Sequence, residues 1–550
     1  MSGNLGLLFL ICWPIIGGIV TYMMGKKKAE SANDMADIVA FVQCVVFAAI
    51  CYLTMNQSTV EFKVNGFAGL TLTLRTDLFR SILGLIVTVC FAVAGIFTKK
   101  QSENMKNVGR YQMFMLFTMG MAGGMMLSAG ISAAFTFLQL MMLSVFPLIA
   151  HDETEGAIKA ASQYLVAAVA GGLVSLIGLV RLLACVGSLS LDTFYAGMMS
   201  SSVTSDVVIA CAFLVVGFLV QAGVIVLGFW TKKTTEHTPD TALMCIMNVC
   251  TRVALMGAIM LTCNLMLKEN EWGAVILVIG LLTLVVSGFL SLFAKNLKNA
   301  ISWLSIAVTA FLVVGLGVMS LGGVANGETA SGTVILFVSG MVGMMVLFMV
   351  YAVVNANCES TDINTIRGFG KKKPVLMIGY LLAACNIAGV PFFGGFQGYA
   401  LIKEGFNIYI QYENNSVASM LAKFVMIFGL ALIVAVVVKL YVVLFVDKND
   451  KMQDVYNEVK RSGMDTTSAM AIIIMAVVPV VCGILSDMTY GKLVALSETT
   501  FRNEGIASAA LLGPNYFVPF GIYFGIGILC YVVFVLALGM KKTEEGRMYR

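Results

Sequence analysis

The sequence predicts an all-α membrane protein that crosses the bilayer many times. Of its 550 residues, 59% are hydrophobic and only 12% are charged, whereas a soluble domain is about 25% charged. The mean hydropathy is +0.92, and apolar runs of about 20 residues, long enough to span a bilayer, recur along the chain. Such a composition cannot cover a water-exposed surface, so it excludes soluble and disordered classes of protein.

Charged residues bound the apolar runs and so define about fifteen predicted helices. The predicted spans are residues 5–24, 35–54, 77–98, 110–129, 131–149, 159–186, 207–230, 240–267, 272–294, 298–320, 331–355, 373–402, 417–446, 467–488 and 516–540. No basic residue precedes the first run, so we interpret it as a spanning helix and not as a signal peptide. Only Ala129 and Gly130 separate the fourth span from the fifth.

The basic residues of the loops predict the orientation of these helices. Alternate loops, at 26–28, 99–110, 159, 232–233, 295–298, 367–373, 448–461 and 541–550, hold 24 of the 35 lysines and arginines. Lysine and arginine in short loops are retained on the cytoplasmic side of a membrane. We therefore expect a multi-pass protein of the cytoplasmic (inner) membrane, with its N-terminus outside and its C-terminus in the cytoplasm.

Five basic residues fall inside the predicted spans, where a charge is costly and often functional. They are Arg80, Arg181, Arg252, Lys423 and Lys439. The first two and Lys423 lie near helix ends, where long basic side chains reach the interface, and Arg252 and Lys439 lie deeper. No Asp or Glu lies in the middle of a span.

The remaining reactive residue types predict no metal, cofactor or catalytic centre in this chain. Twelve of the thirteen cysteines lie in apolar runs and none forms a CxxC pair, so we interpret them as small membrane hydrophobes. The two histidines lie in predicted loops, and no phosphate-binding glycine loop or nucleophile–base spacing occurs. We expect no nucleic-acid partner, since the net positive charge is explained by topology.

One predicted span contains residues that break a helix. Gly389 and Pro391, followed by Gly394 and Gly395, interrupt the apolar run at 373–402. A break at membrane depth frees backbone carbonyls, and such breaks are tolerated where they line a polar cavity.

Four segments resemble the antiporter-like membrane subunits shared by respiratory complex I (NADH-quinone oxidoreductase), Mrp cation/proton antiporters and membrane-bound (group 4) hydrogenases. The segment FLQLMMLS at 137–144 is similar to the family's FWELMSLS, and AIKAASQYL at 157–165 to AxKAxxKYxL. NLKNAISWLSI at 296–306 resembles DLKRLLAYSSI, and AGVPFFGGF at 388–396 resembles AGLPPLxGF. The resemblance implies a 14-helix core with two inverted five-helix repeats and broken helices.

On this resemblance we divide the chain into four parts. Residues 1–109 hold helices 1–3, 110–267 the first inverted repeat, 268–448 the second inverted repeat, and 449–550 the C-terminal helices 14–15.

The chain departs from the family where the resemblance would place ionisable groups. The family's glutamate of the fifth helix falls on Gln139, and the lysine of the broken seventh helix falls on Gln221. In the eighth helix Thr251, beside Arg252, stands where the family often has a lysine, and in the twelfth Tyr399 stands where the family has a lysine or a glutamate. Glutamine cannot take up or release a proton, so these positions can only form hydrogen bonds.

Three basic residues remain as further candidates for an ion path. Lys298 matches the lysine of the DLKR segment, with a topological anchor as the alternative. Lys403 lies four residues after Tyr399 on the same helical face, beyond the predicted helix end, with a loop salt bridge as the alternative. Lys439, which we place in mid-helix, resembles a basic residue of the thirteenth helix, and the alternative is a buried cation bonded to carbonyls.

The resemblance implies an antiporter-like subunit of a redox-driven complex that moves protons or sodium ions, like the membrane arms of complex I or membrane-bound hydrogenase. Its partners would be other membrane subunits, hydrophilic redox subunits and the lipid bilayer, and any enzymatic activity would belong to those subunits. Two alternatives stay open: a structural scaffold subunit with an inactive channel, and a free-standing secondary cation/proton transporter.

Overall fold

The computed structural model describes most of the chain as helices in two compact units. It describes residues 2–55, 59–65, 71–103, 105–187, 189, 205–224, 228–265, 270–321, 326–413, 416–449, 452–459, 464–501, 514–543 and 546–549. The first unit comprises Met1–Trp272 and Thr499–Arg502, and the second comprises Gly273–Glu498 and Asn503–Arg550.

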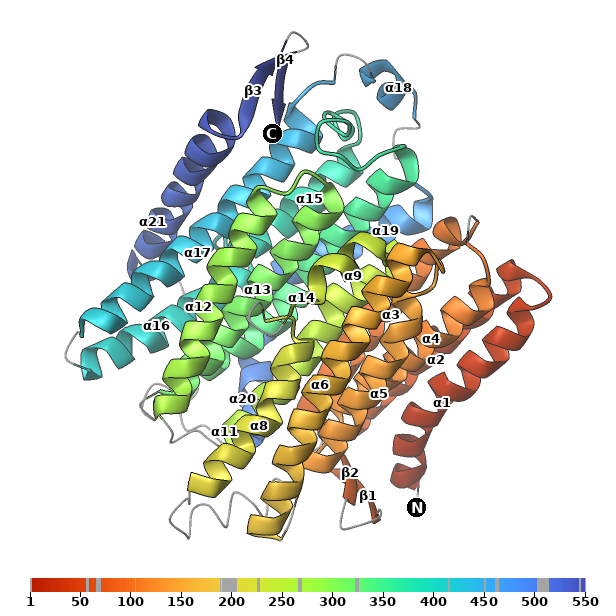
Figure 1. Ribbon diagram of the computed structural model, residues 1–550, viewed down its shortest axis with the longest axis vertical. Helices are drawn as coiled ribbons and strands as arrows, with labels where there is room; N and C mark the ends of the chain where they lie inside the picture. Colours follow the sequence, from red (N-terminus) through yellow and green to blue (C-terminus); the bar gives the residue numbers. More distant parts are fainter. Residues whose placement is uncertain are drawn as a thin grey trace. The chain divides into compact units, whose positions relative to one another are not determined.

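The N-terminal half of the chain contains one β-hairpin among its helices (Figure 1). Its elements are α1 (Ser2–Gly25), α2 (Ala29–Thr54), β1 (Val60–Asn65), β2 (Thr71–Thr76), α3 (Leu78–Ser102), α4 (Val108–Met126), α5 (Ile131–Ile149), α6 (Glu155–Val186), α8 (Ser205–Gln221), α9 (Thr231–His237), α10 (Asp240–Met244), the π-helix η2 (Cys245–Cys250) and α11 (Thr251–Leu265).

The C-terminal half ends in a second antiparallel hairpin. Its elements are α12 (Asn270–Leu292), α13 (Leu297–Ser320), α14 (Asn326–Asn357), α15 (Pro374–Ile387), α16 (Gly394–Tyr412), α17 (Val417–Tyr441), η3 (Val442–Val446), α18 (Gln453–Glu458), α19 (Thr466–Ile484), α20 (Tyr490–Phe501), α21 (Pro514–Cys530), η4 (Tyr531–Ala537), β3 (Met540–Thr543) and β4 (Gly546–Tyr549).

The exposed surface of the helices is apolar, as a bilayer requires. Along α6, one face buries small and polar side chains such as Ala168 and Ser175, while Val166, Leu173 and Ile177 are each more than half exposed. A soluble helix shows the opposite pattern, with polar residues outside. The prediction of a polytopic all-α membrane protein is therefore confirmed.

Within the described residues, twelve helices are long and apolar enough to cross a membrane, against fifteen predicted spans. In two of the other three predicted spans a helix ends inside the predicted range. In the span predicted at 207–230, α8 ends at Gln221 and α9 begins only at Thr231, after the predicted range; the span predicted at 373–402 is divided between α15 and α16. The third, 110–129, forms α4, whose arginine, glutamine and glycines make it less apolar.

The loops predicted to be cytoplasmic in the first unit gather at one end of it. There Lys99 at the end of α3 forms salt bridges with Asp34 and Asp37 of α2, and Arg110 pairs with Glu153 in the α5–α6 loop. The N-terminus and the β1–β2 hairpin lie at the other end of this unit (Figure 1). The alternation of basic and non-basic loops in the sequence thus corresponds to two ends of the unit.

The second unit gathers its own basic loops in the same manner. The backbone of Leu297 bonds to Thr361, and Asn449 donates to the Thr365 carbonyl at 2.8 Å. The C-terminal strand β4 joins them, because Tyr549 exchanges two hydrogen bonds with the Asn364 side chain.

Two of the basic residues predicted to lie near helix ends form ion pairs. Arg80 in the first turn of α3 pairs with Asp77, and Arg181 of α6 pairs with Asp206 of α8. Each arginine is therefore neutralised by a carboxylate of its own unit, in addition to lying near an interface.

We expect the stability of the first unit to fall in acid because of His151, which lies in the loop between α5 and α6. Burial, and then the nearby Arg110 guanidinium, lowers the pKa of His151 below its usual 6.5. The unfolded chain would bind a proton near pH 6.5 that the folded chain resists, so the free energy of unfolding decreases as pH falls below that value. His151→Gln should remove up to about 1.4 kcal/mol of this loss per pH unit, measured by unfolding in detergent between pH 8 and pH 5. An unchanged pH dependence in the variant would contradict this assignment.

Candidate functional site

The second unit contains a helix break at the position that the sequence predicts. Gly389 and Pro391 lie between α15 and α16, and Gly394 and Gly395 open α16. Gly389 has a φ of 66°, a conformation that suits glycine. Asn386 holds the two halves together, because its amide donates to the Ser339 carbonyl at 2.8 Å and accepts from the Gly395 backbone at 3.0 Å.

Two tyrosine hydroxyls satisfy the carbonyls that the break frees. Tyr399 of α16 donates to the Ile387 carbonyl at 3.1 Å. Tyr523 of α21 shares its single hydroxyl hydrogen between the carbonyls of Ala388 and Gly389, at 3.3 and 3.0 Å. Because unsatisfied backbone groups are costly in a membrane, these hydroxyls stabilise the break.

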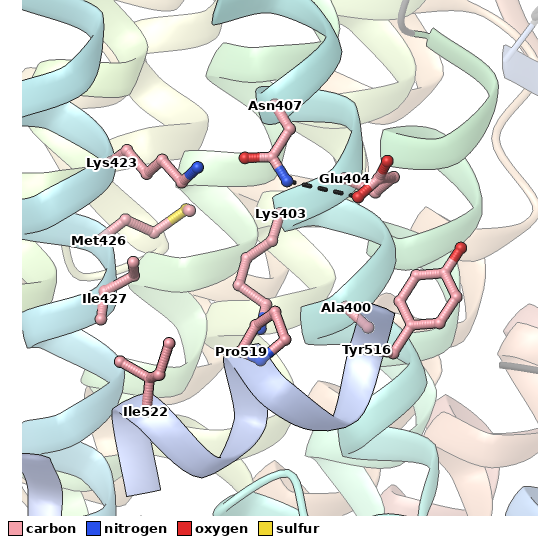
Figure 2. Close-up of a pocket in the computed structure, with 10 residues that line it drawn as sticks. All are labelled: Ala400, Lys403, Glu404, Asn407, Lys423, Met426, Ile427, Tyr516, Pro519 and Ile522. Atoms are coloured by element: carbon pink, nitrogen blue, oxygen red, sulfur yellow. Dashed lines mark hydrogen bonds between the residues drawn. The ribbon is translucent and has the colours of Figure 1, made fainter. Parts of the chain in front are cut away.

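A cavity of about 170 Å³ lies one turn beyond Tyr399, between α16, α17 and α21. Figure 2 shows its lining, which is Ala400, Lys403, Glu404, Asn407, Lys423, Met426, Ile427, Tyr516, Pro519 and Ile522. Asn407 donates to the Glu404 carboxylate at 3.3 Å. Since a water molecule occupies about 30 Å³ of liquid, the space is large enough for several waters or a hydrated cation.

The structure corrects the predicted position of Lys403. We expected the helix to end at residue 402 with Lys403 in a loop, but α16 continues to Tyr412. Lys403 is only 9% exposed, and its ammonium lies 4.8 Å from the centre of the Tyr523 ring. Two adjacent charges and Gly405 ended the apolar run in the sequence without ending the helix. The predicted alternative, a loop salt bridge, is therefore wrong.

Lys439 lies in the last turn of α17, inside the apolar span that the π-helix η3 continues to Val446. Its ammonium donates to the carbonyls of Leu292 and Ala294, at 2.7 and 3.0 Å. These carbonyls lie at the C-terminal end of α12, the negative end of the helix dipole. The Tyr549 ring of β4 covers the ammonium at 5.8 Å. This is the geometry of the alternative interpretation, a buried cation bonded to carbonyls.

We therefore expect Lys439→Met to reduce stability more than ion movement. The substitution leaves two buried carbonyls without their cationic donor, which should cost about 2–3 kcal/mol of unfolding free energy. Lys439→Arg, which keeps the charge and can reach the same carbonyls, is the matched control and should lose less. Two quantities are measured for each variant: the free energy of unfolding, by denaturation in detergent, and the ion flux, normalised to the amount of folded protein. Full stability with lost flux would instead favour a direct role in the ion path.

The first unit contains a helix break lined by neutral groups. Gln221 is fully buried at the end of α8, and its Oε1 accepts a hydrogen bond of 3.0 Å from Tyr164 of α6. Trp230, just before α9, packs edge-on against Tyr164 and donates to the Val220 carbonyl. Gln139 of α5 packs against α6 at Gly172. The structure thus joins Gln221 to a tyrosine but places no carboxylate or lysine there among the described residues.

The other predicted site residues belong to α11 and α13. Thr251 and Arg252 open α11 and are fully buried, and the Arg252 guanidinium donates to the carbonyl and side chain of Asn248 one turn earlier. Lys298 lies in the first turn of α13, which Asn296 caps by accepting from the Lys298 backbone. Lys298 is therefore at the basic end of the second unit, far along α13 from its buried middle.

Sequence reasoning missed Tyr523. The only signal was its place in the predicted span 516–540, 124 positions after Tyr399. Asn407 was also missed, because the helix was expected to end before it.

Comparison with known proteins identifies the family. A family model described as NADH:quinone oxidoreductase/Mrp antiporter, TM matches residues 128–412. NADH-quinone oxidoreductase subunit N of an Azoarcus species is 24% identical over 389 residues, 68% of this chain and 76% of that protein. A Na(+)/H(+) antiporter subunit of Alkalihalophilus pseudofirmus is 22% identical over 409 residues, 73% and 81% of the two chains.

Two solved structures share the fold. A chain of the Mrp complex from a Dietzia species superposes with a TM-score of 0.76 at 14% identity, covering 96% of this chain and 100% of that one. A chain of the archaeal membrane-bound sulfane sulfur reductase superposes with a TM-score of 0.78 at 18% identity, covering 90% and 97%. The family match, the breaks and the fold agree, and the chain belongs to the NADH:quinone oxidoreductase/Mrp antiporter family as an antiporter-like, multi-pass membrane subunit.

Proposed function

We propose that this protein is a membrane subunit of a redox-driven complex that translocates protons or sodium ions. The observation that carries the proposal is Lys403, a buried lysine that lines a cavity of about 170 Å³ next to a helix break. A lysine at membrane depth beside a space large enough for water is a candidate group for taking up and releasing a proton. The names of the relatives, an oxidoreductase subunit and a cation/proton antiporter subunit, support the same function.

In this proposal the two inverted repeats, at 110–267 and 268–448, contribute unequally to proton transfer. At the first break Gln139 and Gln221 cannot change charge, and the Arg252 guanidinium stays protonated at any physiological pH. Such a path can hold water but cannot pass a proton through those groups. The second repeat has Lys403 beside Tyr399, so we assign proton transfer to the second repeat.

The charge distribution and the family suggest how the protein lies in its membrane and which subunits it contacts. The basic ends of the two units would face the cytoplasm, which places the N-terminus outside a cytoplasmic membrane and the C-terminus inside. The exposed apolar faces would contact lipid and other membrane subunits. Hydrophilic redox subunits would supply the driving reaction, as the resemblance to the membrane arm of complex I implies.

Purification and flux measurements test the proposal. An affinity tag on this chain should co-purify further membrane subunits and hydrophilic subunits with redox cofactors from native membranes. The complex in proteoliposomes should take up ²²Na⁺, or acidify the lumen, when a pH or sodium gradient is imposed. Purification of the chain alone with intact flux would favour the free-standing transporter, and a complex without any flux through this subunit would favour the scaffold.

A further inference from the structure

Tyr523 makes two different kinds of contact at the second helix break. Its hydroxyl donates to the carbonyls of Ala388 and Gly389, while its ring lies 4.8 Å from the Lys403 ammonium. The side chain is 1% exposed. It belongs to α21, which lies outside the matched region of 128–412.

The hydroxyl and the ring of Tyr523 act on different groups. The hydroxyl satisfies two carbonyls that the break frees, which stabilises the break in a membrane. The ring face attracts the ammonium through its quadrupole without giving it a directional hydrogen bond.

The Lys403 ammonium has no hydrogen-bond or ion-pair partner among the described residues. Among the residues that the structure describes, Lys403 makes no hydrogen bond or ion pair, and the Tyr523 ring is its one cation–π contact. A group that changes its charge during transport has to avoid a permanent hydrogen bond or ion pair, because either would hold it in one protonation state.

We propose that Tyr523 is a positioning residue for Lys403, so that the C-terminal helix α21 completes the ion site of the second repeat. The proposal rests on the proposed function for its meaning in transport. It assigns to a segment outside the matched region a residue that determines where the lysine ammonium lies.

The other titratable groups of the cavity do not replace this contact. Glu404 is turned toward Asn407 and accepts its hydrogen bond, and Tyr516 lies on the same side of the cavity (Figure 2). Lys423 of α17 faces Lys403 across the cavity as a like charge. The Tyr523 ring and the neighbouring Glu404 carboxylate both offset this repulsion at Lys403.

The pH profile of transport tests the proposal. Tyr523→Leu removes the ring and should shift the pH midpoint of gradient-driven ²²Na⁺ uptake by about one unit toward acid, because the ammonium loses its attraction to the ring. Tyr523→Phe keeps the ring and should keep the midpoint. Tyr531→Leu removes another buried tyrosine of the C-terminal segment and controls for stability alone. A Tyr523→Leu midpoint equal to wild type overturns the proposal, even if the uptake rate falls.

A labelling experiment tests the same contact without transport. Acetylation of Lys403 by a water-soluble amine reagent, quantified by mass spectrometry on the intact complex, should rise several-fold in Tyr523→Leu and not in Tyr531→Leu. Equal labelling of wild type and Tyr523→Leu overturns the positioning role. Absent flux in the wild-type complex would instead count against the proposed function, and the labelling result would still decide the position of Lys403.

Discussion

Lys403→Met should reduce proton or sodium flux through the complex by about 100-fold or more, since loss of a positioned proton-transfer group typically has that effect. Methionine matches the length and apolar stem of lysine, and within the described part of the chain the Lys403 side chain forms no hydrogen bond. The unfolding midpoint should therefore stay near the wild-type value. Flux is measured in proteoliposomes as ²²Na⁺ uptake and as quenching of a pH-sensitive dye.

Lys403→Arg separates charge from proton transfer. The guanidinium keeps the positive charge beside the Tyr523 ring but does not release its proton at physiological pH. If Lys403 only supplies a static charge, the arginine variant should retain flux. If it exchanges protons, the arginine variant should be as inactive as the methionine variant, which is the result we expect.

Two substitutions serve as controls for this experiment. Gln221→Met removes the hydrogen bond from Tyr164 at the first break and should cost stability without reducing flux, since the glutamine cannot titrate. Lys423→Met tests the partly exposed lysine of the same cavity and should have a smaller effect than Lys403→Met. Full flux in Lys403→Met would indicate that this subunit is a scaffold.

The fold could be predicted from the sequence because its signals are local. A run of apolar residues bounded by charge defines a span, and the glycines and proline at 389–395 define the break wherever the rest of the chain lies. The basic loops likewise gather at one end of each unit. Each of these features depends on residues that are neighbours in the sequence.

The environment of the lysines could not be predicted in this way. Lys403 looked like a loop residue because Glu404 and Gly405 follow it, and only its packing against α21 shows that it is buried. Lys439 looked like a mid-membrane charge, but its partners are carbonyls at the end of α12, 147 and 145 positions away. A contact between distant segments leaves no periodic pattern in one sequence.

Gly395→Ala should be the most damaging single-methyl change at the break. A Cβ at this position would lie 1.8 Å from the Asn386 carbonyl oxygen, far inside van der Waals contact. Asn386 cannot move aside freely, since its side chain holds both the Ser339 carbonyl and the Gly395 backbone. We expect a loss of about 3 kcal/mol or more of unfolding free energy, at the upper end for overpacking, because backbone and not a flexible side chain must shift.

Gly525→Ala on α21 is the matched control for this substitution. No atom lies within 4 Å of a Cβ built at Gly525, so the same methyl group should be neutral or stabilise the helix by about 0.5–1 kcal/mol. Denaturation of both variants in detergent micelles measures the difference in their unfolding free energies. Gly395→Ala should also reduce flux beyond its loss of folded protein, because displacing Asn386 shifts the start of α16 and with it Tyr399 and Lys403. Equal stability of the two variants would mean that the close approach of α15 and α16 at this glycine is not a feature of the folded protein.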